Sequence, residues 1–341
     1  MILGAEKMPT VSIIVPCYNE ETTIGLLLEA VYAQTYPRAE MEVVIADGLS
    51  SDNTRAEIAA FQRMHPDLDV RVVDNNTRTI PAGLNRAIEA ARGQYILRLD
   101  AHSIPYPDYV ERSILALEQG LGDNVGGVWE IRPGGTGWIA ETIAAAAAHP
   151  LAVGDALYRH ATRAAEVDTV PFGAYRKTLI DKIGNYDENL LTNEDYEFNT
   201  RIRQAGGRLW LDPDIRSVYF ARSTLRALAR QYWRYGFWKW RMLRRYPKTL
   251  RWRQALPPLF VLGLLTGILL ALVFPILWYL VGVVIALYFS VLLFAGIQTA
   301  IRLKRTVMVP GLLLAIPVMH LAWGSGFLWS LLTSLGGRQR D

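Results

Sequence analysis

The sequence predicts a doubly wound α/β domain followed by a helical, membrane-associated region, and two observations lead to this division. The first is the alternation of apolar strands with amphipathic helices over residues 10–100, which is typical of a mostly parallel sheet covered by helices. The second is a pair of charge-free stretches, Ala255 to Ile301 and Thr306 to Gly337. A helix that crosses a bilayer needs about 20 apolar residues, so these stretches are long enough to hold such helices.

Four strands are expected where short, β-branched runs end in polar residues: 10–20 (with its apolar run ending at Pro16), 41–48, 69–75 and 95–100. Helical spacing of apolar residues fills the intervals 20–34, 51–65 and 79–93. In such sheets ligands bind beyond the carboxyl ends of the strands. The polar residues at those ends therefore predict the active site, and they are Asn19, Glu20, Asp47, Asn75 and Asp100.

The charge of the chain is divided along its length. Residues 1–214 hold 19 Lys and Arg against 31 Asp and Glu, a net charge of −12, whereas residues 215–341 hold 17 against one, a net of +16. A basic half without acids indicates an anionic partner, either nucleic acid or phospholipid. The neighbouring charge-free stretches favour membrane phospholipid and argue against nucleic acid.

Three regions are therefore expected: an α/β domain over 1–222, basic aromatic interfacial helices over 223–255, and about three membrane helices over 256–335, near 257–274, 276–298 and 308–334. The single cysteine excludes intrachain disulfides and suits a cytosolic domain. The positive-inside rule places the basic residues 302–305 in the cytoplasm, which predicts a multi-pass protein of the cell (inner) membrane. A third crossing would put Arg338 and Arg340 outside, against that rule.

Two common nucleotide-binding motifs are missing from the sequence. The residues after the first strand are Pro-Cys-Tyr-Asn-Glu-Glu, without the G-x-G-x-x-G turn of dinucleotide-binding domains, and there is no G-x-x-x-x-G-K-[ST] phosphate loop. Any nucleotide must therefore be bound in another way.

Asp100 and His102 stand two residues apart at the end of the fourth strand, in "YILRLDAHSIP". A carboxylate and an imidazole together suit Mn²⁺, while Mg²⁺ prefers oxygen ligands. The pair is a candidate metal site. The alternative is a turn aspartate that caps the next segment, next to a surface histidine.

Four stretches occur in the order and spacing of glycosyltransferase family 2: "VSIIVPCYNEE", "VVIADGLSSDNT", "GLNRAIEAARGQYILRLDAH" and "NEDYEFNTRIRQAG". The chain resembles this family, and its C-terminal half makes it most similar to the succinoglycan-type membrane glycosyltransferases. The resemblance implies the GT-A fold and inverting transfer of a sugar from a nucleotide-diphosphate donor. The usual D-x-D motif is replaced by Asp100-Ala101-His102, a variant in which the histidine also binds metal.

The resemblance also implies roles at the first two strand ends. Pro16, Tyr18 and Glu20 would line the base and ribose of the donor, Asp47 would accept from a uracil ring, and Asp100 would contact the donor through the metal. Without the resemblance, Tyr18 is equally well explained as a half-buried core aromatic. Glu20 is then an acid in the first turn of a helix, where acids are favoured.

A helix is predicted to begin near Thr192 or Asn193, with Glu194 and Asp195 in its first turn. The positive end of the helix dipole keeps a nearby carboxylate ionised, as a general base requires. In the family pattern Asp195 is the catalytic base. Glu194 is the alternative base.

The segment 226–247 places five arginines at helical spacing among tryptophans and other aromatics, which is typical of a helix lying in the lipid headgroup layer. Within it, Gln231 and Arg234 resemble the Q-x-x-R-W motif of membrane family members, with Tyr235 in the tryptophan position. That motif implies contact with the donor diphosphate and the acceptor.

These observations predict a metal-dependent (Mn²⁺ or Mg²⁺), inverting glycosyltransferase that uses a nucleotide sugar, UDP-linked by the family pattern, and a polyprenyl-linked acceptor at the cytoplasmic membrane face. Alternatives are a polyprenyl-monophosphate glycosyltransferase, a processive polysaccharide synthase, a non-catalytic membrane scaffold with a transferase-like fold, and a small transporter. The sequence specifies neither the sugar nor an oligomeric state.

Overall fold

The computed structural model describes residues 10–335, and its packing separates the chain into two units. The first comprises residues up to Glu130 together with His160–Tyr219, and the second comprises Ile131–Arg159 together with the chain from Phe220 onward. The boundary near residue 220 lies close to the domain boundary expected at 222. The segment 131–159 differs from that expectation, because it packs within the second unit. Arg338 and Arg340 lie outside the described residues.

The strands have these bounds: β1 Val11–Cys17, β2 Met41–Asp47, β3 Asp69–Asp74, β4 Tyr95–Arg98, β5 Ile104–Pro105, β6 Asn124–Pro133, β7 Ala165–Glu166, β8 Ala174–Arg176 and β9 Leu209–Ala221. The α-helices are α1 Ile24–Tyr32, α2 Thr54–Met64, α3 Ile80–Ala90, α4 Tyr109–Glu118, α5 Trp138–Ala147, α6 Pro150–Val153, α7 Thr178–Ile183, α8 Glu194–Gln204, α9 Leu225–Arg245, α10 Trp252–Val273, α11 Leu277–Leu303 and α12 Met308–Leu335. All four predicted strands and the three helices between them are present.

The first unit is built on a sheet with the strand order β3-β2-β1-β4-β8-β6-β9-β5, in which β7 also pairs with β9. The first four strands in this order are parallel, as predicted. The later strands, which sequence periodicity did not identify, pair in antiparallel fashion where β8 meets β4 and β6. The doubly wound prediction is therefore confirmed for the half of the sheet that β1 to β4 form, and the complete sheet is mixed.

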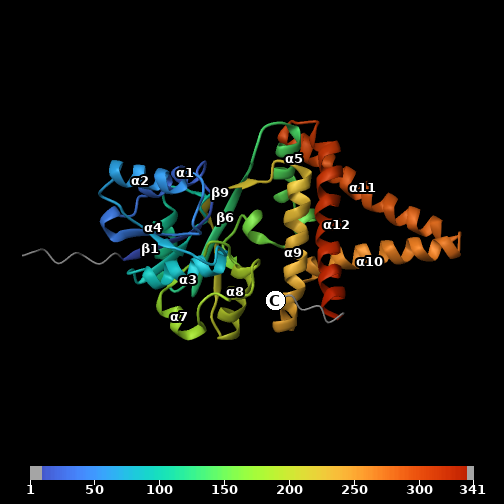
Figure 1. Ribbon diagram of the computed structural model, residues 1–341. Helices are drawn as coiled ribbons and strands as arrows, with labels where there is room; N and C mark the ends of the chain where they lie inside the picture. The colour runs from blue at the N-terminus through green and yellow to red at the C-terminus, as the bar shows by residue number, and fades with distance from the viewer. Residues whose placement is uncertain (1–9, 336–341) are drawn as a thin grey trace, which may run out of the picture. The chain divides into compact units, whose positions relative to one another are not determined.

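Both faces of the sheet are buried, which explains why its strands are almost entirely apolar. In β1, Val11, Ile13 and Val15 pack toward one core, which α1, α2 and α4 cover, while Ile14 packs toward the other, which α3 and α8 cover. Figure 1 shows α1 and α2 on one side of β1 and α3 on the other. Because the parallel strands are aligned in register, Cys17 pairs with Asp47, and Asp47 pairs with Asp74. The polar strand ends therefore meet at one edge.

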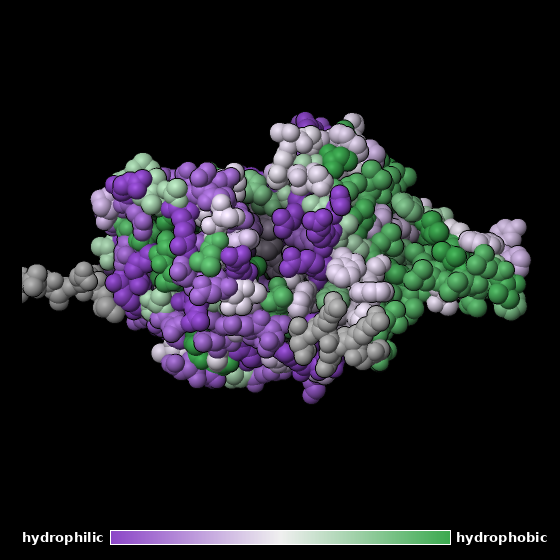
Figure 2. Space-filling view, in the orientation of Figure 1, coloured by the Kyte–Doolittle hydropathy of each residue, from purple (hydrophilic) through white to green (hydrophobic). Residues whose placement is uncertain are grey.

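The second unit contains three helices long and apolar enough to cross a membrane, α10, α11 and α12, as the sequence predicted. The helices α10 and α11 run side by side as a hairpin (Figure 1), and its surface is strongly hydrophobic (Figure 2). The predicted basic helix is also present as α9, a single helix of 21 residues.

Helices α9 and α12 pack closely because glycines lie at their contact (Figure 1). A Cβ atom added to Gly236 would lie 2.1 Å from the backbone oxygen of Trp323, and one added to Gly326 would lie 2.1 Å from that of Trp233. Only residues without a side chain permit so close an approach. Beyond this contact, the indole Nε1 of Trp240 donates to Ser334 Oγ at 2.9 Å, so the two helices stay together to the end of α12.

This packing predicts that Gly236→Ala destabilises the protein. Alanine normally stabilises a helix interior by about 0.5–1 kcal/mol relative to glycine, but here the methyl group would collide with a backbone oxygen, and overpacking costs about 1–3 kcal/mol. The measurement is the thermal unfolding midpoint of the purified protein in detergent.

Gly263→Ala in α10 is the matched control, because nothing lies within 4 Å of a Cβ atom at that position. It should raise the midpoint or leave it unchanged. If both variants were equally stable, the close α9–α12 contact would be wrong.

Candidate active site

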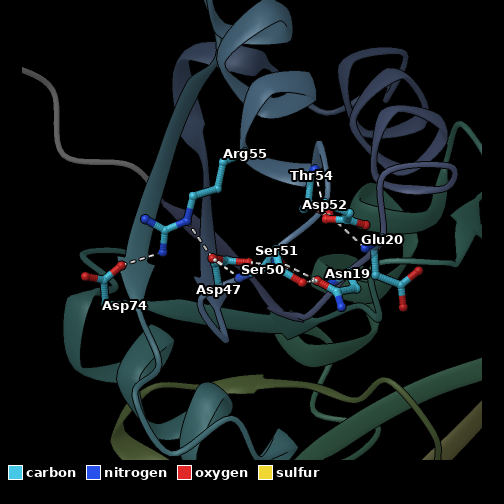
Figure 3. A network of polar contacts seen from close by, with 9 residues as sticks. All are labelled: Asn19, Glu20, Asp47, Ser50, Ser51, Asp52, Thr54, Arg55 and Asp74. Carbon is cyan, nitrogen blue, oxygen red and sulfur yellow. Dashed lines mark hydrogen bonds and ion pairs between the residues drawn. The ribbon is translucent and has the colours of Figure 1, made fainter.

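Two loops at the carboxyl edge of the parallel strands are joined by side-chain hydrogen bonds (Figure 3). Asn19, which follows β1 with a positive φ of 55°, donates its backbone N–H to Ser50 Oγ at 2.8 Å and accepts from the backbone N–H of Ser51 at 2.9 Å. The backbone N–H of Glu20 donates to Thr54 Oγ1 at 2.8 Å. The loops after β1 and β2 therefore form one surface.

Asp47 lies beneath this surface, fully buried at the end of β2. Its carboxylate accepts from Ser50 Oγ at 2.5 Å and from Arg55 Nε at 2.6 Å, and Arg55 also reaches Asp74 at 2.5 Å (Figure 3). In this state Asp47 holds the ends of β2 and β3 together. Its expected contact with a uracil ring stays a prediction.

Tyr18 offers an accessible aromatic face at the same edge, since 46% of the residue is exposed. The preceding Pro16, also expected to line the base, is partly exposed in β1. The guanidinium carbon of Arg78 lies 6.0 Å from the centroid of the Tyr18 ring. Arg78, which has a positive φ of 57°, was not identified from the sequence, because nothing in its local pattern distinguishes it from a surface arginine.

The guanidinium of Arg98 joins three carboxylates from distant parts of the sequence. Its Nη2 atom donates to Asp100 Oδ1 at 3.0 Å and to Glu194 Oε1 at 2.9 Å, and its Nη1 atom donates to Asp195 Oδ1. The Arg98 side chain is only 2% exposed. The predicted metal-binding strand end and the predicted base on α8 are therefore brought together by one buried residue.

The sequence analysis did not identify Arg98 as a site residue, although its position in a buried strand could have indicated it. It is the one charged residue of a strand whose four positions are all buried. A buried charge must be paired, so a charged residue inside such a strand indicates partners close to it in the fold.

The acids of α8 begin a helix whose N-cap is Asn193, one of the two predicted positions. Burial raises the pKa of Asp195 to about 7, Arg98 opposes this shift, and Glu194 and Asp100 add to it. About a quarter of the Asp195 side chain, 24%, nevertheless stays exposed. A carboxylate that titrates near neutral pH and remains accessible has the properties of a general base.

His102 and Glu20, which the sequence assigned to separate roles, contact each other. His102 Nδ1 lies 3.0 Å from Glu20 Oε1, and the Glu20 carboxylate points away from the loop network in Figure 3. Glu20 Oε2 also accepts from Thr23 Oγ1 at 2.5 Å. The ends of β1 and β4 are thus linked through these two side chains.

Residues 12–184 match the family described as Glycosyl transferase family 2. The chain is also 32% identical to the succinoglycan biosynthesis protein ExoA of Rhizobium meliloti (strain 1021), and the match covers 94% of this chain and 94% of that protein. This chain belongs to glycosyl transferase family 2. It is therefore a glycosyltransferase, and such enzymes typically invert the transferred sugar. The scaffold and transporter alternatives are not supported.

Two further relatives of this family 2 enzyme are informative. The chain is 29% identical over 77% of its length to the dolichyl N-acetyl-alpha-D-glucosaminyl phosphate 3-beta-D-2,3-diacetamido-2,3-dideoxy-beta-D-glucuronosyltransferase of Methanococcus voltae, covering 84% of that protein. The fold is similar to that of the mannosyltransferase PcManGT from Pyrobaculum calidifontis, solved with GDP-Man and Mn²⁺, with a TM-score of 0.62, 20% identity, and coverage of 97% of this chain and 88% of that one. The predicted GT-A fold is confirmed.

Asp100 and His102 remain the predicted ligands of a divalent metal ion in this glycosyltransferase. Between residues 10 and 335, no group of three or more His, Cys, Asp or Glu side chains is arranged to hold a metal. The side chains of Asp100 and His102 would supply two coordinating atoms, and the oxygens of a bound diphosphate would supply the remaining ones. Glu20 contacts Nδ1 of His102, and such carboxylate–histidine pairs commonly orient metal ligands.

Gln231 and Arg234, the remaining predicted donor residues, lie on α9 in the second unit. Gln231 Nε2 donates to the hydroxyl of Tyr235 at 2.9 Å, one helical turn later. Tyr235, which replaces the tryptophan of the family motif, therefore orients the glutamine side chain. The contact of Gln231 and Arg234 with the donor stays a prediction.

We expect Arg98→Lys to lower activity by about a hundredfold. Lysine keeps the positive charge, but its compact ammonium cannot reproduce the planar fork that bonds several carboxylates, and small misplacements of reacting groups cost about that factor. Turnover of the nucleotide-sugar donor would be measured on purified protein.

Arg92→Lys is the control, because Arg92 also pairs with two carboxylates, Glu42 and Asp69. This variant should keep nearly full activity. Equal activity of the Arg98 and Arg92 variants would exclude a role for Arg98 in placing the site.

Proposed function

We propose that this enzyme transfers a sugar, with inversion, from a nucleotide-diphosphate donor to a polyprenyl-linked acceptor at the cytoplasmic face of the inner membrane, in the synthesis of a polysaccharide or glycoconjugate. The donor is UDP-linked. The reaction depends on Mn²⁺ or Mg²⁺ held by Asp100 and His102. Asp195 is the general base.

The observation that carries this proposal is the contact of Arg98 with Asp100 and Asp195. Asp100 follows the strand edge where GT-A enzymes bind their donor, and Asp195 begins the helix that bears the family's base. The contact of one side chain with both carboxylates supports their assignment to the donor side and the acceptor side of one reaction centre.

The proposed reaction is a single displacement. Asp195 removes the proton from the acceptor hydroxyl, and the oxygen attacks the anomeric carbon of the donor sugar. The bond from that carbon to the nucleoside diphosphate breaks, and the diphosphate leaves with the electron pair. Attack opposite to the leaving group inverts the anomeric configuration.

A divalent cation bound by Asp100 and His102 would neutralise negative charge on the leaving diphosphate. The cluster itself is suited to positive charge, because the one guanidinium of Arg98 faces three carboxylates. Glu20 would hold the ring of His102 in the ligand orientation through their 3.0 Å contact.

The lipid acceptor is proposed from the second unit and from the relatives. The Methanococcus voltae protein is named for a dolichyl-phosphate-linked substrate. Helix α9 combines arginines with tryptophans, a composition suited to the headgroup layer, where a membrane-tethered hydroxyl lies. A lipid-linked acceptor therefore agrees with the apolar helices that follow.

The direct test is to incubate membranes containing the enzyme with radiolabelled nucleotide sugars and a polyprenyl-lipid extract. Label should move from a UDP-sugar into the organic phase. Release of a lipid monophosphate sugar would instead identify a polyprenyl-monophosphate glycosyltransferase. Label that stays entirely in water would contradict a lipid acceptor.

Asp195→Asn should lower turnover by about a hundred- to ten-thousand-fold, because the amide cannot accept the proton of the acceptor and removal of a general base typically has this effect. Donor binding should change little, since the base acts in the transition state. The two quantities would be measured by steady-state kinetics and by equilibrium binding of UDP.

Glu194→Gln is the matched control, since Glu194 is adjacent, contacts the same guanidinium and loses the same charge. It should retain most activity. If Glu194→Gln were inactive while Asp195→Asn resembled the wild type, the roles of the two acids would be reversed.

Chelation should abolish transfer, and added Mn²⁺ should restore it. Asp100→Ala should remain inactive at any Mn²⁺ concentration, whereas His102→Asp should keep part of the activity, because a carboxylate can replace the imidazole as a ligand. Full activity in excess chelator would rule out the metal.

A further inference from the structure

The helix α12 differs from α10 and α11 in how it is surrounded. In its most apolar stretch 44% of residues are buried within the protein, against 22% in each of the other two. Helix α5 packs against its beginning, where a Cβ atom on Gly311 would lie 2.3 Å from Thr142. Helix α9 packs along its second half. The ends of α10 and α11 near Phe274 and Ile276 are instead more than half exposed.

The middle of α12 meets the beginning of α10. The indole of Trp323 donates to the backbone oxygen of Gln254 at 3.2 Å, and a Cβ atom on Gly324 would lie 2.5 Å from the backbone oxygen of Pro257. If α12 crossed the bilayer, its middle would lie at the hydrocarbon centre. The first turn of α10 would then lie there too.

Charged groups next to this contact argue against that depth. Arg253, in the same turn of α10, forms an ion pair with Asp155, which follows α6. On the same face of α12, one turn earlier, the backbone oxygen of Leu151 in α6 lies 3.0 Å from His320 Nε2. An ion pair is costly to place at the centre of a bilayer, so the middle of α12 belongs at the depth of the headgroups.

Helix α9 leads to the same conclusion. It contains seven basic residues and no acid: Arg226, Arg230, Arg234, Lys239, Arg241, Arg244 and Arg245. Because α9 remains against α12 as far as Ser334, a crossing α12 would carry this helix into hydrocarbon. A helix with that charge does not cross a membrane.

We propose that only α10 and α11 cross the membrane, and that α12 lies in the plane of the headgroup layer, so that the C-terminus is on the same side as the catalytic unit. Both ends of the α10–α11 hairpin carry ion pairs to the segment 131–159, Arg253 with Asp155 and Arg305 with Glu141. Both ion pairs can form if the hairpin leaves the headgroup layer at Arg253 and returns to the same layer at Arg305.

The proposal also explains the exposed face of α12, which would contact lipid. Its residues Leu314, Leu321, Ser325, Trp329, Leu332 and Leu335 are exposed and follow one another at helical spacing along a single stripe. A narrow apolar stripe on a helix whose other faces are covered suits the boundary between headgroups and acyl chains. With α12 in plane, Arg338 and Arg340 obey the positive-inside rule that a third crossing would violate.

The test is protease access to single tags in the full-length protein. Three versions of the protein would each carry one cleavable tag, at the N-terminus, within the hairpin tip at Pro275, or after Asp341. Protease would be added to spheroplasts and, separately, to inverted membrane vesicles that contain each version. The N- and C-terminal tags should be cleaved from one side and the tip tag from the other. Cleavage of the C-terminal tag from the same side as the tip would overturn the proposal.

A pair of substitutions tests depth independently of tags. Leu265 in α10 and Leu321 in α12 are exposed leucines at 54% and 43%, each near the middle of its apolar stretch. Leu265→Lys should lower the yield of membrane-inserted protein by about fivefold or more, because it puts a charge in hydrocarbon. Leu321→Lys should leave the yield within about twofold, because its ammonium reaches the headgroups. Equal losses would place Leu321 in hydrocarbon and overturn the proposal.

Discussion

The geometry of the candidate site depends on the guanidinium of Arg98, because it joins three carboxylates that would otherwise repel one another. Asp100 follows β4, and Glu194 and Asp195 begin α8, almost a hundred residues later. A buried arginine cannot lose its proton, and its planar fork bonds several oxygens at once. One side chain thus links the end of β4 to the first turn of α8.

The same arrangement leaves the Arg98 cluster rich in negative charge. Three carboxylates face a single cation. Burial raises the pKa of Asp195, one of the three, and the charges of Glu194 and Asp100 add to that shift. The links Glu20–His102 and Asp47–Arg55–Asp74 tie the neighbouring strand ends to one another. The protein therefore holds its polar groups in place before a donor arrives, which lowers the reorganisation needed for reaction.

The second unit depends on close helix packing as well as on its ion pairs. Glycines at 236 and 326 let the basic helix α9 lie directly against α12, and this contact makes the environment of α12 unlike that of the α10–α11 hairpin. Under the proposal that α12 lies in the plane of the membrane, apolar length by itself does not identify a crossing helix. What a helix packs against decides how deep in the membrane it can lie.

The sequence by itself determined the parallel strands, the helices between them, the apolar helices and the family, because hydrophobic periodicity and motif spacing are local properties. It also identified Asp100, Glu194 and Asp195 as candidate site residues. Only the tertiary structure revealed that Arg98 joins those acids, that Glu20 contacts His102, that Arg78 lies beside Tyr18, and that residues 131–159 pack with the C-terminal helices. These contacts join residues far apart in the chain, and their geometry is set by how whole elements pack. A local pattern can indicate that a buried charge such as Arg98 needs partners, but it does not say which distant residues those partners are.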